Sequence, residues 1–185
     1  FPPFRMNAVP PSSRRGVSER PFLNRRLIAA VALVLSGSTH AATITWVGNT
    51  DLNWSGDNWS PNVPVSGDSL VFGAAGSPGT NLNNDFAPGT AIAGITFTSS
   101  APSYRIGGNA FDLVGDVFSN SSLAQEISAP LTLSGTRLIS PTVAGSVINL
   151  SGAISGSGSI SKQGSGTLIL ANPTNTYTGG TVFAA

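Results

Sequence analysis

The sequence predicts an all-β protein, a right-handed parallel β-helix (a β-solenoid), preceded by a signal-peptide helix. Three observations along residues 42–185 predict this class. Short alternations of apolar and polar residues recur, turns containing glycine and asparagine separate them, and no ten-residue stretch keeps a helical period free of breakers. A β-sandwich is the alternative, although the long turns lack the Asn-Gly or Asp-Gly pair of a two-residue hairpin.

The first 41 residues are predicted to be a leader. Nine apolar residues occupy positions 27–35, six of the nine basic residues lie before them, and a small polar segment follows. A basic, an apolar and a cleavable region in this order are typical of a secretory signal peptide. The apolar run is about half of the ~20 residues that span a bilayer, so we expect cleavage after Ala41 or Ala42. The pair Arg25–Arg26 leaves open whether export follows the general secretory or the twin-arginine route.

The remainder of the chain is weakly acidic. It has three basic residues against seven acidic ones, a net charge of −4. Nucleic-acid binding is therefore not expected, because neutralising phosphates requires clustered lysines and arginines. The sequence has no cysteine, and its one histidine, His40, lies in the leader. We therefore expect no disulfide framework, no Ser-His-Asp catalysis and no cofactor.

The β-rich part is predicted to have two regions. Residues 42–128 form a Trp- and Asn-rich β region with a cap, and residues 129–185 form the coils of the β-helix. "LTLSG" from Leu131, "INLSG" from Ile148 and "TLILAN" from Thr167 recur at intervals of 17 and 19 residues, which suits coils of about 20 residues. The expected strands are 42–48, 68–73, 91–99, 103–108, 111–115, 129–135, 146–155, 158–162 and 166–172.

The last predicted coil carries a specific motif. From Gly156 the chain reads "GSGSISKQGSGTLILANPTNTYTGGTVFAA". This segment resembles the autotransporter-associated β-strand repeat, also called the passenger-associated transport repeat. The matching positions, to which the resemblance gives a structural role, are Lys162, Gly164, Gly166, Thr167, Leu168, Leu170, Asn175, Thr176, Tyr177, Gly179, Gly180 and Thr181.

The resemblance implies a non-enzymatic, exported β-helical passenger or stalk on the surface of a Gram-negative-type bacterium, or secreted from it. Its role would be structural or adhesin-like. Its partner would be an extracellular glycan or a host or neighbouring surface, with membrane contact only through the signal peptide or a C-terminal anchor. Because the repeat unit breaks off after Thr181, we expect an N-terminal fragment of a longer protein. The alternative is a glycan-binding or glycan-cleaving β-helix protein.

Three tryptophans, Trp46, Trp54 and Trp59, fall within 14 residues. Exposed indoles would stack on sugar rings and mark a glycan contact. Buried indoles would cap the open end of a β-helix, which otherwise exposes its apolar interior and an unpaired strand edge. The sequence favours the cap and leaves the glycan contact as the alternative.

Two pairs of acidic residues are candidate catalytic groups for glycan hydrolysis, Asp51 with Asp57 and Asp112 with Asp116. Such catalysis requires two carboxylates about 5–10 Å apart. All four lie in turn-rich segments where aspartate commonly bends the backbone, so we expect structural roles.

The segment from Asp51 also matches part of a calcium-loop pattern. Asp51, Asn53, Ser55 and Gly56 occupy positions 1, 3, 5 and 6 of that pattern, but Asn62 stands where its bidentate glutamate belongs. A polar turn is therefore expected and no metal site is predicted.

Overall fold

The computed structural model describes residues 41–184, and the predicted leader helix lies outside the described residues. Within this range the chain folds into stacked parallel coils of a β-solenoid, about six turns in all, and contains no helix. The predicted all-β solenoid is therefore confirmed, and the alternative β-sandwich is wrong. None of the described segments is a helix of the length and hydropathy needed to cross a membrane.

Each complete coil runs through three faces. The first face contains β1 (Thr43–Trp46), β2 (Trp59–Ser60), β3 (Ser69–Phe72), β5 (Thr90–Phe97), β7 (Phe111–Ser119), β10 (Thr136–Pro141), β13 (Ser159–Lys162) and β15 (Thr181–Phe183). The second contains β4 (Asn81–Asn84), β6 (Arg105–Gly108), β8 (Ala124–Ile127), β11 (Val147–Leu150) and β14 (Thr167–Leu170). The third joins the first parts of β5 and β7 to β9 (Leu131–Leu133) and β12 (Ile154–Gly156).

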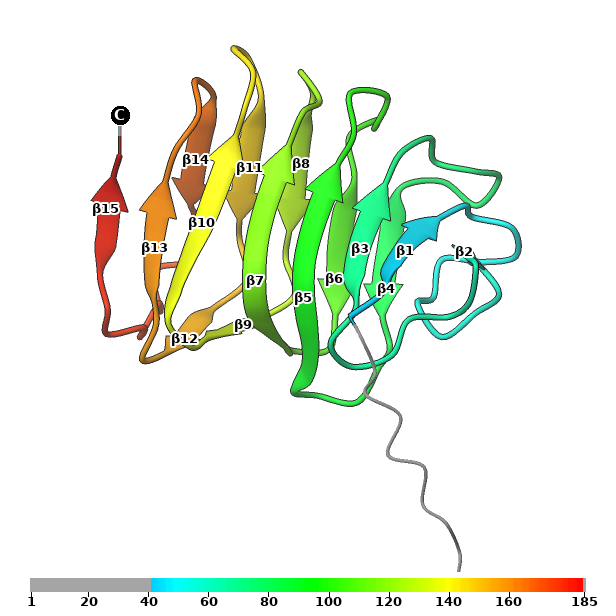
Figure 1. The fold of residues 1–185 in the computed structure, drawn as a ribbon, viewed down its shortest axis with the longest axis horizontal. Coiled ribbons are helices and arrows are strands. Elements are labelled where there is room, and N and C mark those ends of the chain that lie inside the picture. The colour runs from blue at the N-terminus through cyan, green and yellow to red at the C-terminus, as the bar shows by residue number, and fades with distance from the viewer. Residues whose placement is uncertain (1–40, 185) are drawn as a thin grey trace, which may run out of the picture. The chain divides into compact units, whose positions relative to one another are not determined.

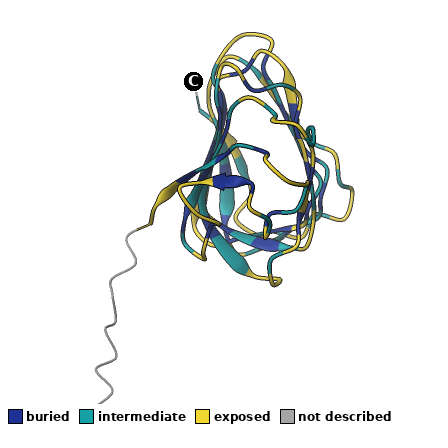
Figure 2. Cartoon of the chain, turned by 90° about the vertical axis from the view of Figure 1, so that its right-hand side faces the viewer, coloured by how far each residue is buried: buried dark blue, intermediate teal, exposed yellow. Residues whose placement is uncertain are grey.

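Apart from β2, which lies on the outer edge of β1, the strands follow one another in chain order along the stack (Figure 1). The first sheet runs β2-β1-β3-β5-β7-β10-β13-β15 and the second runs β4-β6-β8-β11-β14. All pairs are parallel except β1 with β2, which is antiparallel. The stack passes without a break through residue 128, because β7 pairs with β9 and β6 with β8. Viewed along the stack, the coils superimpose as a ring (Figure 2).

The register gives the true coil length. Equivalent residues of successive coils are 20 to 26 positions apart, as Val147 with Thr167 and Thr43 with Ser69 show. The sequence interval of 17 residues between Leu131 and Ile148 is not a coil repeat, because these two residues lie on different faces. Leu131 pairs with Ile154, and Ile148 pairs with Leu168. The similar pentapeptides "LTLSG" and "INLSG" therefore belong to strands on different faces, and the interval between them does not measure the coil length.

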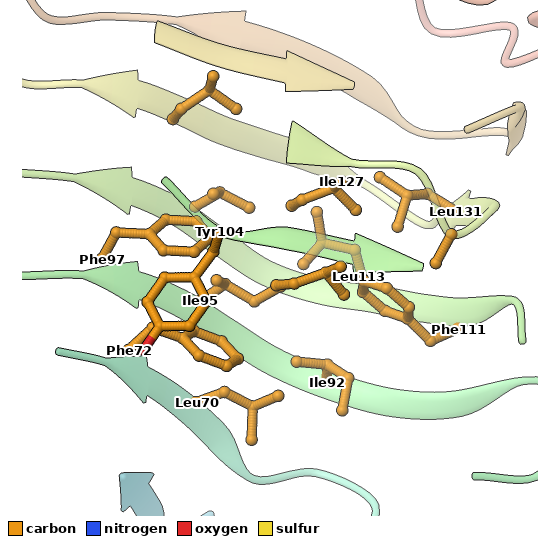
Figure 3. Close-up of a cluster of buried hydrophobic side chains, with 14 of the residues drawn as sticks. Leu70, Phe72, Ile92, Ile95, Phe97, Tyr104, Phe111, Leu113, Ile127 and Leu131 are labelled. Atoms are coloured by element: carbon orange, nitrogen blue, oxygen red, sulfur yellow. The ribbon is translucent and has the colours of Figure 1, made fainter. Parts of the chain in front are cut away.

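The core is built of columns that run along the stack. Leu70, Ile95, Val117 and Ile139 come from successive coils, pair in register and are at most 1% exposed. Figure 3 shows this interior, filled from all three faces by aliphatic and aromatic side chains. Burial of each such side chain contributes about 1.5–3 kcal/mol, so the columns supply the main stabilising term.

One buried tyrosine links two coils and predicts a pH dependence. Tyr104 is 1% exposed, and its hydroxyl lies 3.0 Å from the carbonyl oxygen of Ala74 and 3.1 Å from that of Gly73. Burial raises the pKa of Tyr104 to about 12, above the ordinary tyrosine pKa of about 10. The unfolded chain therefore loses this proton first as the pH rises above 10. We expect stability to fall between pH 10 and 12, because the folded state binds more protons there.

Denaturant titrations across this pH range, together with tyrosinate absorbance, check the prediction. Tyr104→Phe removes the ionising hydroxyl and is expected to flatten this part of the stability profile. Tyr177 remains in that variant as the internal absorbance reference. A tyrosinate signal of equal size at pH 11 in the native protein and in the unfolded chain would contradict the raised pKa.

Candidate functional site: the repeat coil, the N-terminal cap and the outward face

The repeat residues form the last complete coil and the corner that leads into β15. Lys162 ends β13, and its Nζ donates to the carbonyl oxygen of Gly164 at 2.5 Å. Leu168 and Leu170 lie on β14, pair with Ile148 and Leu150 and pack partly buried against the core. The repeat motif thus extends the interior columns by one coil.

The glycines of the motif permit the coils to approach closely. A Cβ on Gly164 would lie 2.4 Å from the carbonyl oxygen of Pro141, and Gly164 has a φ of +77°. A Cβ on Gly166 would lie 2.4 Å from the carbonyl oxygen of Ser146, and one on Gly179 would lie 2.4 Å from that of Gly158. Only glycine fits at these corners without a backbone shift.

The Asn-Thr-Tyr segment replaces a strand on the third face. The backbone N–H groups of Thr176 and Thr178 donate to the carbonyl oxygens of Ile154 and Gly156. The side chain of Asn175 accepts the N–H of Ile154 at 2.8 Å, and the hydroxyls of Tyr177 and Thr181 lie 2.6 Å apart. The polar residues of the motif therefore pair the free edge of β12, while Gly180, with a φ of +75°, turns the chain towards β15.

Asn175→Ala is expected to destabilise the last coil by about 1–3 kcal/mol, because the N–H of Ile154 then loses its acceptor. The loss should appear as faster hydrogen exchange of β12 and β14. Asn175→Asp is the matched control, since it keeps an oxygen acceptor at the same position and should lose less. Equal destabilisation by both variants would show that this hydrogen bond is not the source of the effect.

The three tryptophans lie together at the N-terminal end of the stack. Trp46, Trp54 and Trp59 are 1%, 0% and 3% exposed. The Trp59 ring packs edge-on against Trp46 at 5.0 Å and Trp54 at 5.9 Å, and its indole N–H donates to the carbonyl oxygen of Trp54 at 2.8 Å. Phe72 packs against all three. With every ring covered, none presents a face on which a sugar could stack in this conformation.

A buried asparagine organises the polar loop of this cap. The Asn58 side chain is fully buried. Its Oδ1 accepts from the backbone N–H groups of Thr50 and Asp51, and its Nδ2 donates to Asp51 Oδ1 at 2.7 Å. The same Asp51 oxygen accepts the N–H of Asn53 at 2.8 Å. These hydrogen bonds, first that from the Asn53 backbone and then that from the Asn58 side chain, lower the pKa of Asp51.

Two of the acidic residues proposed as catalysts accept backbone hydrogen bonds: Asp51 Oδ1 from the N–H of Asn53 in the cap loop, and Asp116 Oδ1 from the N–H of Leu138 of the next coil, each at 2.8 Å. Asp112 and Asp116 both lie on strand β7, so the expectation that they occupy turn-rich segments is wrong. Ser55 of the calcium pattern bonds instead to Asp85. Within residues 41–184 no group of three or more His, Cys, Asp or Glu residues could hold a metal ion.

A hollow of about 320 Å³ on the outward side of the second face was not foreseen from the sequence. It is lined by Asn81, Leu82, Arg105, Gly107, Gly108 and Ser128. Asn81 and Asn83 of β4 pair with Arg105 and Gly107 of β6, so the missing side chain at Gly107 interrupts a row of polar side chains. The sequence signal was the "RIGG" of β6, in which a glycine occupies an outward strand position.

The ion pair beside the hollow orients its cation. Arg105 Nε lies 3.5 Å from Glu126 Oε2, and the Ser151 hydroxyl donates to Glu126 Oε1 at 2.6 Å. The Arg105 side chain is 57% exposed, so this pair contributes little to stability. The pair instead orients the guanidinium group, because it engages the Nε edge and leaves the two terminal nitrogens available.

Comparison with known proteins connects the last coil with a family. Comparison with the curated proteins and with the solved structures gives no match. Residues 160–185 match the family model of the passenger-associated-transport-repeat, so the coil and corner formed by Ile160 to Thr181 carry that repeat.

Proposed function

We propose that this chain is a segment of an exported passenger or stalk, located on or released from the surface of a Gram-negative-type bacterium, with a structural or adhesin-like role and no enzymatic activity. One observation carries the proposal. The coil that matches the passenger-associated-transport-repeat is not an isolated motif but the last complete turn of a continuous solenoid of about six turns. The repeat is therefore part of the solenoid itself and not an appendage to it.

The physical basis of the role is an extended, self-supporting stack. Each coil contacts mainly its neighbours, so stability grows coil by coil. The sequence contains no cysteine, and hence the fold requires no oxidising step. Such a stack would hold its outward faces at fixed positions along its length, which suits display of an interaction surface outside the cell.

Export is tested with the full chain, tagged at its C-terminus and expressed in a Gram-negative host. We expect the tagged protein outside the cytoplasm, with a mature N-terminus at or next to Ala42. Leu33→Arg, in the middle of the apolar run, should retain the chain in the cytoplasm, whereas Ser38→Thr should leave export unchanged. An unprocessed chain in the cytoplasm would refute the export part of the proposal.

Glycan binding or cleavage is the second candidate, and the open polar hollow beside Arg105 favours its binding form. A polysaccharide panel, applied to the full chain with and without calcium, tests binding. Turnover that disappears in Asp51→Ala or Asp112→Ala would support an enzyme and contradict the non-enzymatic role.

A further inference from the structure

We propose that the hollow over Gly107 is a binding site for an acidic saccharide, in which the carboxylate of a uronate-type sugar pairs with the guanidinium of Arg105. The inference goes beyond the passenger or stalk role and does not depend on it. It rests on the shape of the hollow, on the one cation that borders it, and on the polar groups around it.

The shape follows from two glycines on β6. Gly107 lies between Asn83 of the preceding coil and Ser128 of the next, and a Cβ there would lie 3.2 Å from Ser128 Oγ. Gly108, with a φ of +97°, leaves no room for a side chain, since a Cβ would lie 2.3 Å from the carbonyl oxygen of Asn84. Bare backbone therefore forms the floor. The resulting volume of about 320 Å³ falls at the lower end of the ~300–1,000 Å³ of small-molecule sites.

The preference for an acidic ligand follows from the hydrogen-bond partners of the three cationic side chains within residues 41–184. Arg137 donates its two terminal nitrogens to the carbonyl oxygens of Val114 and Ser134, and Lys162 donates to the carbonyl oxygen of Gly164. Arg105 differs, because its contact with Glu126 is made through Nε. Its two terminal nitrogens have no hydrogen bond within the described residues. This fork matches a carboxylate in a bidentate geometry.

The remaining groups suit hydroxyls rather than apolar side chains. Asn81 is exposed and offers an amide donor and a carbonyl acceptor. Ser128 Oγ donates to the carbonyl oxygen of Ile106 at 3.2 Å and keeps its lone pairs as acceptors. Leu82 is the one large apolar residue of the lining and is only 3% exposed. A peptide would find no pocket for its side chains, whereas a sugar would find donors and acceptors on both sides of the Arg105 fork.

The test is calorimetric titration of the full chain with tetragalacturonate and with its methyl ester, which has the same rings and linkages but no charge. We expect saturable binding of the acid and binding about 10- to 100-fold weaker for the ester, the factor of one charge-assisted hydrogen bond or pair. Arg105→Gln should weaken binding of the acid by a similar factor. Arg105→Lys keeps the charge but loses the two parallel donors, so its affinity for the acid should lie between those of the native chain and of Arg105→Gln.

Two further variants separate the site from general charge. Gly107→Thr fills the hollow, keeps Arg105 and is expected to lose binding. Lys162→Gln removes one positive charge elsewhere on the stack and should leave binding unchanged. Thermal unfolding of each variant checks that the stack is intact. Export of the native chain is measured in a separate experiment, so the saccharide site and the passenger or stalk role can fail independently.

Three outcomes would overturn the inference. The first is the lack of saturable binding of tetragalacturonate in the millimolar range. The second is equal binding of acid and ester, or equal binding by the native chain and Arg105→Gln. The third is tighter binding of an oligoglutamate peptide of equal charge, which would assign the hollow to an acidic peptide instead.

Discussion

Gly115→Ala is expected to prevent the native stack from forming, or to destabilise it by more than about 3 kcal/mol. A Cβ at this position would lie 1.4 Å from the carbonyl oxygen of Ala93 and 2.5 Å from its carbon. Both atoms are backbone, so no side chain can turn aside. The register of β5 and β7 shifts between Ile92 and Gly94, so the clash occurs where both strands bend from the third face to the first. The chain must therefore move a whole corner to accept one methyl group.

Gly73→Ala is the matched control. Gly73 does not have a positive φ, and a Cβ there would meet only the hydroxyls of Thr98 and Ser100, at 3.5 and 3.7 Å. We expect its free energy of unfolding to stay within about 0.5 kcal/mol of that of the native protein. Circular dichroism and urea titration of the two variants measure the difference. A Gly115→Ala protein with native stability would show that the two bulged corners are not as closely stacked as described.

Trp54→Ala is expected to cost about 3–5 kcal/mol, the cost of emptying a large aromatic site in a close-packed core. The indole is fully buried and packs on Trp59 of the cap loop and on Phe72, Phe86 and Phe111, which come from two successive coils. Its removal leaves a cavity where the cap meets the stack. We expect the loss in the urea unfolding midpoint, with increased acrylamide quenching of the fluorescence of Trp46 and Trp59.

Trp54→Phe and Leu123→Ala are its controls. The first keeps an aromatic ring in the cavity and should recover a substantial part of the loss. The second removes a side chain that is 50% exposed, so its effect should be small. If the native protein itself shows strong acrylamide quenching, the indoles are open to solvent and the cap assignment fails.

The solenoid could be predicted from the sequence because its signals are local. Alternating pairs such as Leu168 and Leu170, with glycine turns on either side, specify a strand with one buried face whatever lies beside it. Among the strands that sequence reasoning missed, which are β2, β4, β8, β10 and β15, two clearly lack this signal. β4 is Asn81–Asn84 with Leu82 as its one apolar residue, and β8 is Ala124–Ile127 with Gln125 and Ile127 facing inward.

These missed strands depend on the neighbouring coils. Gln125 is fully buried because its amide donates to Pro102 and Leu123 and its oxygen accepts from the N–H of Tyr104, three partners that no local pattern reveals. The hollow at Gly107 escaped prediction for the same reason. A glycine in a strand becomes a cavity only when the side chains of the coils on either side are known.

The antiparallel contact of β2 with β1 gives the stack a direction. At Thr45 and Trp46 the edge of β1 is already paired with Ser60 and Trp59, whereas β15 ends the same sheet with Val182 and Phe183 60% and 76% exposed. The first sheet therefore has one closed edge, at the end of the stack where the tryptophans lie. We expect the paired edge at Thr45 and Trp46 to be the last part of the stack to open, and a pulling force along the stack to release the cap after the other described coils.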